Sequence, residues 1–208
     1  MRTIKDPLER KNEILDTAEA LFFTKGYEKT TINDILNEIG IAKGTFYYYF
    51  KSKDEVMDAI VVRMASNAIQ AAEAVADNPN LPVQEKLIQI FANSFSSEHK
   101  EEMIEHMHQS GNAELHQRSL TQCVVQLTPV LTRVLEQGIS EGLFSTPYPK
   151  ECIESLLVST QFLFDEGLFQ WAPEELQRKI AAQIYMMERI LGAAPGSLAY
   201  VAGFFSTN

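Results

Sequence analysis

The sequence predicts an all-α protein with an N-terminal three-helix domain followed by a helical bundle. Strand signals are almost absent, whereas apolar residues recur at spacings of three and four along most of the 208 residues. Capping side chains precede several of these stretches, and glycine or proline follows them. The proportions of hydrophobic and charged residues, 45% and 22%, are typical of a folded protein.

The pattern in the first quarter of the chain predicts three helices and the start of a longer fourth one. Gly26 is placed to end the first helix, and Thr31 with Asp34 forms a capping box at the start of the second. Gly40 stops the second helix, and Ser52 caps the fourth. The expected helices cover residues 7–25, 31–39, 42–49 and 52–76.

The remainder predicts a helical bundle with a clear break at residues 77–82. Pro129 is expected to kink or split a long helical segment. After Gly192 the chain is expected to be loosely held. The expected helices cover residues 82–96, 98–109, 113–141, 150–170 and 173–191, and the expected domains are 1–54, 55–192 and a tail at 193–208.

The acidic charge lies outside the first 54 residues. The formal net charge is -10, yet the first 54 residues hold nine basic and nine acidic side chains. The overall balance excludes a protein coated in basic charge, but it allows a local cationic face. Residues 42–53 contain three lysines and no acid, which favours a face that approaches phosphates, although chance in a short window is the alternative.

Two cysteines, Cys123 and Cys152, are too few and too far apart for a disulfide framework or a cysteine-rich zinc site. The N-terminus lacks the apolar core of a signal peptide, and no apolar run is long enough to span a bilayer. We therefore expect a cytoplasmic protein with no membrane contact and no cofactor.

Residues 30–50 read TTINDILNEIGIAKGTFYYYF, which is the pattern of a helix-turn-helix. Five apolar residues can point inward: Ile35, Ile39, Ile41, Phe46 and Phe50. The outer face of the second helix then carries Lys43, Gly44, Thr45, Tyr47 and Tyr48, which suit phosphates and base edges. The alternative is a plain helical hairpin with an aromatic core, but three adjacent tyrosines spread over roughly 200° of a helix and cannot all be buried.

Residues 10–61, above all TTINDILNEIGIAKGTFYYYFKSKDEV, resemble the DNA-binding domain of tetracycline-repressor-type (TetR) transcription regulators. The resemblance implies a phosphate contact for Thr31 and a base contact for Asn33. It implies that Lys43, Gly44, Thr45 and Tyr47 face the major groove. It further implies backbone contacts from Tyr48 and Tyr49, and a phosphate contact from Lys53.

The resemblance also implies a homodimer on a palindromic operator. A helix of about eight residues reads only a few base pairs, so two copies are needed for affinity. Apolar residues surround the helix at 153–164 and form a wide stripe along 173–191, which suits a dimer surface, although a monomeric bundle is the alternative.

The middle of the chain is then expected to bind a small-molecule effector that releases the DNA. Large, adaptable side chains can line a cavity there, although each could simply fill the core. The candidates are Phe91, Phe95, Met103, His106, Met107, Phe162 and Glu166, with Phe164 as a further aromatic residue.

The sequence also allows functions other than DNA binding. The segment from His99 to His116 is rich in His and Glu and would suit a helical metal-binding or enzymatic module, but no fixed metal-ligand spacing occurs there. No phosphate loop, nucleophile elbow or Cys/His pairing indicates a catalytic site, so we expect no enzyme. A pure protein-interaction bundle and a transcription activator are the remaining alternatives.

Overall fold

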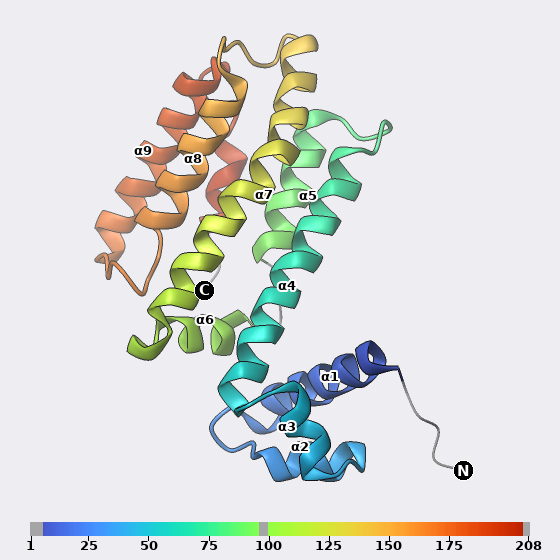
Figure 1. The fold of residues 1–208 in the computed structure, drawn as a ribbon. Coiled ribbons are helices and arrows are strands. Elements are labelled where there is room, and N and C mark those ends of the chain that lie inside the picture. The colour runs from blue at the N-terminus through green and yellow to red at the C-terminus, as the bar shows by residue number, and fades with distance from the viewer. Residues whose placement is uncertain (1–5, 96–99, 206–208) are drawn as a thin grey trace. The chain divides into compact units, whose positions relative to one another are not determined.

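The computed structural model describes residues 6–95 and 100–205 (Figure 1). These residues form nine α-helices and two short 3-10 helices, and they contain no strand. The predicted all-α class is therefore confirmed. The chain divides into two compact units, one of residues 1–66 with 98–115 and the other of residues 67–97 with 116–208. We call them the N-terminal unit and the bundle unit.

The N-terminal unit is organised around one aromatic and aliphatic core. Phe22 of α1, Ile35 of α2, Phe46 of α3 and Ile60 of α4 are all completely or almost completely buried. The unit contains α1 (Pro7–Lys25), α2 (Ile32–Ile39), α3 (Lys43–Tyr49), the first part of α4 (Lys53–Ala76), α6 (Lys100–His108) and the 3-10 helix η1 (Ser110–Asn112).

The helix starts follow the capping pattern of the sequence. The Asp6 carboxylate accepts the Leu8 N–H at 2.8 Å, and Glu9 accepts the Asp6 N–H at 3.3 Å. At the start of α4, the hydroxyl of Ser52, one residue before the helix, accepts the N–H of Glu55 at 3.0 Å. These side chains satisfy backbone donors that a helix end leaves unpaired, which fixes where the helices begin.

The segment containing α6 belongs to the N-terminal unit, which the sequence pattern gave no sign of. His106 is 2% exposed, and its Nε2 lies 3.2 Å from an Asp58 carboxylate oxygen. Its ring meets the Tyr27 ring edge to face, with centroids 5.2 Å apart. Asn112 donates to the His106 carbonyl at 2.8 Å. A buried polar side chain therefore pins α6 against residues of α4 and the α1–α2 loop.

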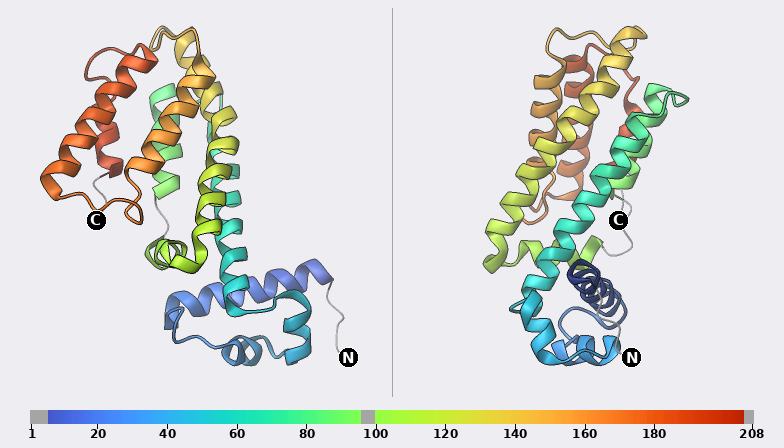
Figure 2. Two further views of the ribbon diagram at one scale, coloured as in Figure 1. Left: turned by 60° about the vertical axis from the view of Figure 1, so that its left-hand side comes forward. Right: turned by 45° about the vertical axis from the view of Figure 1, so that its right-hand side comes forward.

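The bundle unit places α8 and α9 side by side (Figure 1 and Figure 2). Its core includes Ile90, Val130, Leu156 and Met187. The unit contains the second part of α4, α5 (Val83–Phe95), most of α7 (Ala113–Ser140), α8 (Pro149–Leu163), α9 (Pro173–Leu191) and the 3-10 helix η2 (Ala199–Phe205). Among the described residues, no helix has the length and apolar character needed to cross a bilayer.

The structure changes two expectations for the long helices of the bundle. Of the two forms expected at Pro129, a kink or a split, the split is wrong, because α7 continues through Pro129. Val125 and Pro129 are both exposed, so the carbonyl that loses its N–H partner can bond to water. The helix predicted to reach residue 170 ends at Leu163, because the Asp165 carboxylate accepts the N–H groups of Gly167 and Leu168 and closes a turn there.

The end of the described chain is packed rather than loosely held. Glu188 of α9 accepts the Leu198 N–H at 3.0 Å and also bonds the Gly196 N–H. These two bonds hold the pKa of the Glu188 carboxyl below its usual value. Leu198 and Val201 are buried in the bundle core. The expectation of a loose tail is wrong for residues 193–205, because a polar anchor and two apolar side chains hold them.

Gly192 ends α9 in a conformation and a space that only glycine fits. Its φ is 63°, and a Cβ there would overlap the Ser145 carbonyl group. Gly196 has a φ of 82° but open space around it. We predict that Gly196→Ala costs about 1–2 kcal/mol of unfolding free energy from backbone strain alone. Gly192→Ala should cost roughly 3 kcal/mol or more, because strain and backbone overlap act together.

Urea denaturation of both variants, followed by circular dichroism, measures the difference. Equal losses for the two variants would show that the contact between Ser145 and the end of α9 contributes nothing to stability.

Candidate nucleic-acid interface

The start of α2 is held by a cluster of polar contacts around Asp34. The Asp34 carboxylate accepts the Thr31 N–H and the Thr31 hydroxyl, both at 2.7 Å. Lys25 of α1 donates to the same carboxylate at 2.7 Å. The bond from Lys25, followed by the bonds from Thr31, holds the pKa of Asp34 well below its usual value. The predicted capping box is therefore present, and it is linked to α1.

The turn between α2 and α3 is shaped by a left-handed glycine and three buried side chains. Gly40 has a φ of 74°, and its N–H bonds the Leu36 carbonyl at 2.9 Å. Ile41, Phe46 and Phe50 are buried in the core of the unit. Because Phe46 and Phe50 are four residues apart, they lie on one face of the chain, and the opposite face of α3 points away from the core.

The opposite face carries the predicted DNA-contacting groups. Tyr47 and Tyr48 are 43% and 78% exposed, and Lys43 and Gly44 are exposed as well. Thr45 and Tyr49 are half-buried. The Tyr48 and Tyr49 rings meet edge to face at 4.9 Å, and the Lys43 ammonium lies 5.8 Å from the Tyr47 ring centroid. We call Lys43, Gly44, Thr45, Tyr47 and Tyr48 the α3 face.

Gly44 leaves open space on this face. A Cβ at Gly44 would meet no atom of the protein within 4 Å, and its backbone is ordinary helix. Alanine in place of glycine at a compatible backbone position generally stabilises a protein by about 0.4–1 kcal/mol, because the unfolded chain has less freedom to lose. Neither the packing nor the backbone of the folded chain therefore requires glycine at this position.

Asn33 and Lys53, which are also predicted to contact DNA, differ in how exposed they are. Asn33 in the first turn of α2 is exposed. Lys53 is half-buried, because its ammonium donates to the Tyr27 carbonyl at 2.7 Å and lies 4.0 Å from the Tyr27 ring centroid. Lys53 thus fixes the α1–α2 loop, a role that the sequence did not reveal. Lys51, which is exposed, is the cation nearest the end of α3 in sequence.

The residues predicted to bind an effector are distributed over both units. His106 and Met107 belong to the N-terminal unit, whereas Phe91, Phe162 and Glu166 belong to the bundle unit. Phe162 is 51% exposed and packs on Phe169. Glu166 is also exposed, so neither side chain is enclosed. Phe91 is half-buried. The side chains of Phe95 and Met103 lie outside the described part of the structure.

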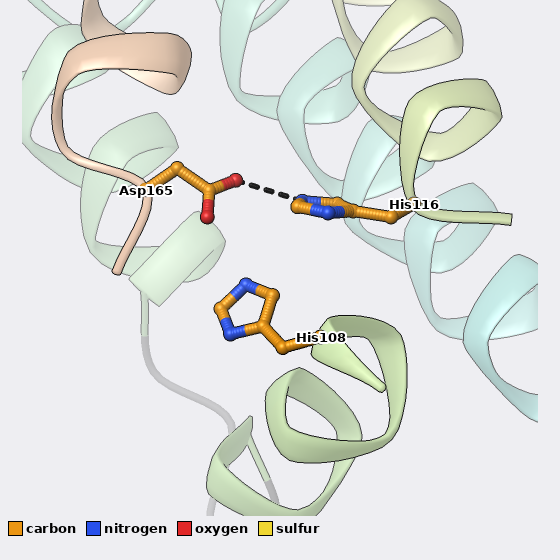
Figure 3. Close-up of side chains that lie close together, drawn as sticks. All are labelled: His108, His116 and Asp165. Atoms are coloured by element: carbon orange, nitrogen blue, oxygen red, sulfur yellow. Dashed lines mark ion pairs between the residues drawn. The ribbon is translucent and has the colours of Figure 1, made fainter. Parts of the chain in front are cut away.

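Two of the histidines considered for metal binding lie beside a carboxylate of their own unit. His116 of α7 lies 2.7 Å from Asp165 within the bundle unit (Figure 3). His106 lies beside Asp58 in the N-terminal unit. His99 lies outside the described residues. Each of these two contacts joins a helix to another part of the same unit.

The geometry of α2, the turn and α3 defines a class of protein. A capped helix, a glycine turn and a short helix with an outward aromatic and cationic face form a helix-turn-helix DNA-binding domain. Residues 14–60 match the family described as bacterial regulatory proteins of the TetR family, and residues 95–185 match the tetracyclin repressor-like C-terminal domain. The chain belongs to the TetR family of DNA-binding transcription regulators.

Individual relatives agree with this assignment. The chain is 27% identical to the HTH-type transcriptional repressor KstR2 of Mycolicibacterium smegmatis over 152 residues, which cover 68% of this chain and 71% of that protein. It is 34% identical to the HTH-type transcriptional regulator EthR of the same species over 93 residues, covering 43% and 42%. These relatives are regulators, so the expectation that the chain is not an enzyme is confirmed.

Solved structures share the fold. A TetR-family regulator from Pectobacterium atrosepticum is 18% identical with a TM-score of 0.61, covering 90% of this chain and 98% of that one. The SmeT–triclosan complex is 22% identical with a TM-score of 0.56, covering 90% and 93%. At these identities the likeness concerns the fold alone.

The contacts of Asp34 predict a dependence of stability on pH. The folded pKa lies below the unfolded value, so the folded state binds fewer protons. The stabilisation is therefore complete at neutral pH, declines as the pH falls below the ordinary value of 3.8, and is lost as the pH passes through the depressed pKa. We predict that Asp34→Asn lowers the thermal unfolding temperature at neutral pH, and that the difference from wild type shrinks at about pH 3.

Asp77→Asn is the matched control, because that carboxylate makes only an exposed pair with Arg133 in the bundle unit. A difference in unfolding temperature between Asp34→Asn and wild type that stays constant from neutral pH to about pH 3 would contradict the stabilising role of the Asp34 carboxylate.

Proposed function

We propose that the chain is a repressor that acts in the cytoplasm, binds a palindromic operator as a homodimer and releases it when a small molecule binds. The observation that carries the proposal is the exposed α3 face, with its lysine, glycine and tyrosine groups turned away from the core. The KstR2 relative, which is named as a repressor, supports this sign of regulation.

The α3 face has the chemistry that a duplex requires. Lys43 can neutralise a phosphate, and the hydroxyls of Thr45, Tyr47 and Tyr48 can donate to phosphate oxygens or base edges. The open space at Gly44 lets the helix backbone come close to the floor of the groove. In this proposal, Asn33, Thr31 and Tyr49 contact the DNA at the edge of the α3 face. Lys53 contributes by fixing the loop, and its remaining N–H donors can still reach a phosphate.

The outer face of α8 and α9 supplies the dimer surface in this proposal. Val158 and Phe162 are 53% and 51% exposed on α8, four residues apart, and Met186 and Ile190 repeat this spacing on α9. Tyr185, the residue before Met186, is 57% exposed as well. An exposed apolar stripe on two adjacent helices is costly in water and suits burial against a second copy of the same stripe.

The bundle unit is the place of the effector in this proposal. The SmeT–triclosan complex is a small-molecule complex of a protein with the same fold, which supports a small-molecule ligand here. By linkage, an effector that weakens operator binding must itself be bound more weakly by the operator complex.

The DNA contact predicts a loss of binding without a loss of folding. On duplexes recovered by in vitro selection with the wild-type protein, Tyr47→Ala should weaken binding by about tenfold or more. Lys43→Ala should lower the slope of log affinity against log salt by about 2 in a dimer, because one phosphate contact is lost in each subunit. Electrophoretic mobility shifts at several salt concentrations measure both effects.

Gly44→Ala separates the DNA contact from the stability of the protein. It should raise the unfolding free energy by about 0.4–1 kcal/mol, because alanine has less backbone freedom to lose on folding than glycine has. It should nevertheless weaken DNA binding, because the methyl group occupies the approach path. Tyr148→Ala is the control, since Tyr148 is 66% exposed in the bundle unit. Wild-type DNA affinity in Gly44→Ala and Tyr47→Ala would refute the proposed interface.

The dimer surface predicts a change of oligomeric state. Phe162→Glu combined with Met186→Glu places like charges on both sides of a symmetric interface, and should raise the dimer dissociation constant by about 100-fold or more. Analytical ultracentrifugation measures this constant. Val125→Glu is the control, because Val125 is 66% exposed on α7. A double variant that dimerises like wild type would place the interface elsewhere.

A further inference from the structure

The last described segment of the chain covers two aromatic side chains of the bundle unit. Phe204 of η2 stacks on Phe91 of α5, with ring centroids 5.6 Å apart and an interplanar angle of 26°. Phe205 packs on Phe164 at the end of α8, with centroids 4.6 Å apart. Consecutive residues of a 3-10 helix point about 120° apart, so adjacent residues of η2 reach two different elements.

The segment has an anchor that is separate from these ring contacts. Glu188 bonds the N–H groups of Gly196 and Leu198, and the Leu198 side chain is 4% exposed. Tyr200 is half-buried, and Val201 is buried in the bundle core. Residues 196–201 are therefore fixed on α9 and the core, whereas the rings of Phe204 and Phe205 lie beyond the anchor.

The rings of Phe204 and Phe205 are less deeply buried than the anchor. Phe204 and Phe205 are half-buried, unlike Leu198 and Val201, which are buried. Displacing the two rings would thus leave the core beneath Leu198 and Val201 closed. Phe91 and Phe164, which the rings cover, carry no hydrogen-bonding group. A ligand would therefore meet only ring faces and ring edges, and its own rings could pack on them in an offset or tilted arrangement.

We propose that the ring face of Phe91 that Phe204 covers is a binding site for an apolar compound with one or two aromatic rings, and that Phe204, held together with Phe205 on Phe164, occupies this site until such a compound displaces it. The proposal rests on the proposed ligand response and names the chemical class of the ligand. Because the segment competes within the same chain, it raises the apparent dissociation constant in proportion to how seldom the site is open.

The test uses the full chain and the uncharged aromatic probe N-phenylnaphthylamine, followed by fluorescence. The double variant Phe204→Ala/Phe205→Ala should bind one probe per subunit, with a dissociation constant at least about tenfold lower than that of wild type. Adding Phe91→Ala to the double variant should remove this gain. Tyr148→Ala, which changes an exposed ring elsewhere in the bundle unit, should leave probe binding unchanged.

A second variant keeps every ring in place. Glu188→Gln weakens the anchor at Gly196 and Leu198 and should also lower the dissociation constant of the probe, by a smaller factor. It carries the test if the double variant does not fold, as judged by circular dichroism and thermal unfolding. Because the probe titration contains no DNA, its failure is distinguishable from a failure of the proposed regulator function, which the mobility shifts measure.

Two results would overturn the proposal. Wild-type probe affinity in a folded double variant, or in Glu188→Gln if only that variant folds, would make η2 a permanent part of the core. A gain that survives Phe91→Ala would place the probe at another site.

Discussion

Burial of Phe46 and Phe50 is the contact on which the α3 face depends. With seven residues, α3 is far too short to be a stable helix by itself. Its helical form must therefore come from packing, and Phe46 and Phe50 are 0% and 2% exposed. Once these two rings are fixed in the core, the direction of Tyr47 and Tyr48 is fixed as well. The same burial that stabilises the N-terminal unit thus orients its outward groups.

The charges of the N-terminal unit are arranged around this contact. Several acids are engaged within the unit: Asp34 by Lys25, and Asp16 and Glu19 by Arg63 of α4. No acid occurs in α3, and Lys43 and Lys51 on either side of its tyrosines are exposed. A chain with a net charge of -10 can therefore present a cationic surface to DNA, since only the sign of the docking face matters.

Local signals explain what the sequence predicted well. The helix starts at Pro7 and Ile32 and the stop at Gly40 depend on residues within four positions, and the inward and outward residues of α3 follow from helical periodicity. Long-range contacts explain what the sequence did not predict. The Asp165 turn that ends α8 early pairs with His116 of α7, and His106 packs on Tyr27 and Asp58. No spacing rule reports such partners.

In the bundle unit, residues that would not touch a ligand can set the apparent affinity for it, because they hold residues 196–205 in place. If the segment competes with the ligand, the apparent affinity depends on the intrinsic affinity and on the fraction of molecules in which Phe204 and Phe205 have left. Glu188 stabilises the anchor, although its bonds to Gly196 and Leu198 involve neither Phe91 nor Phe164. A change at Glu188 would therefore shift the response to every ligand of this site by a common factor, whereas a change at Phe91 would alter the response according to the shape of each ligand.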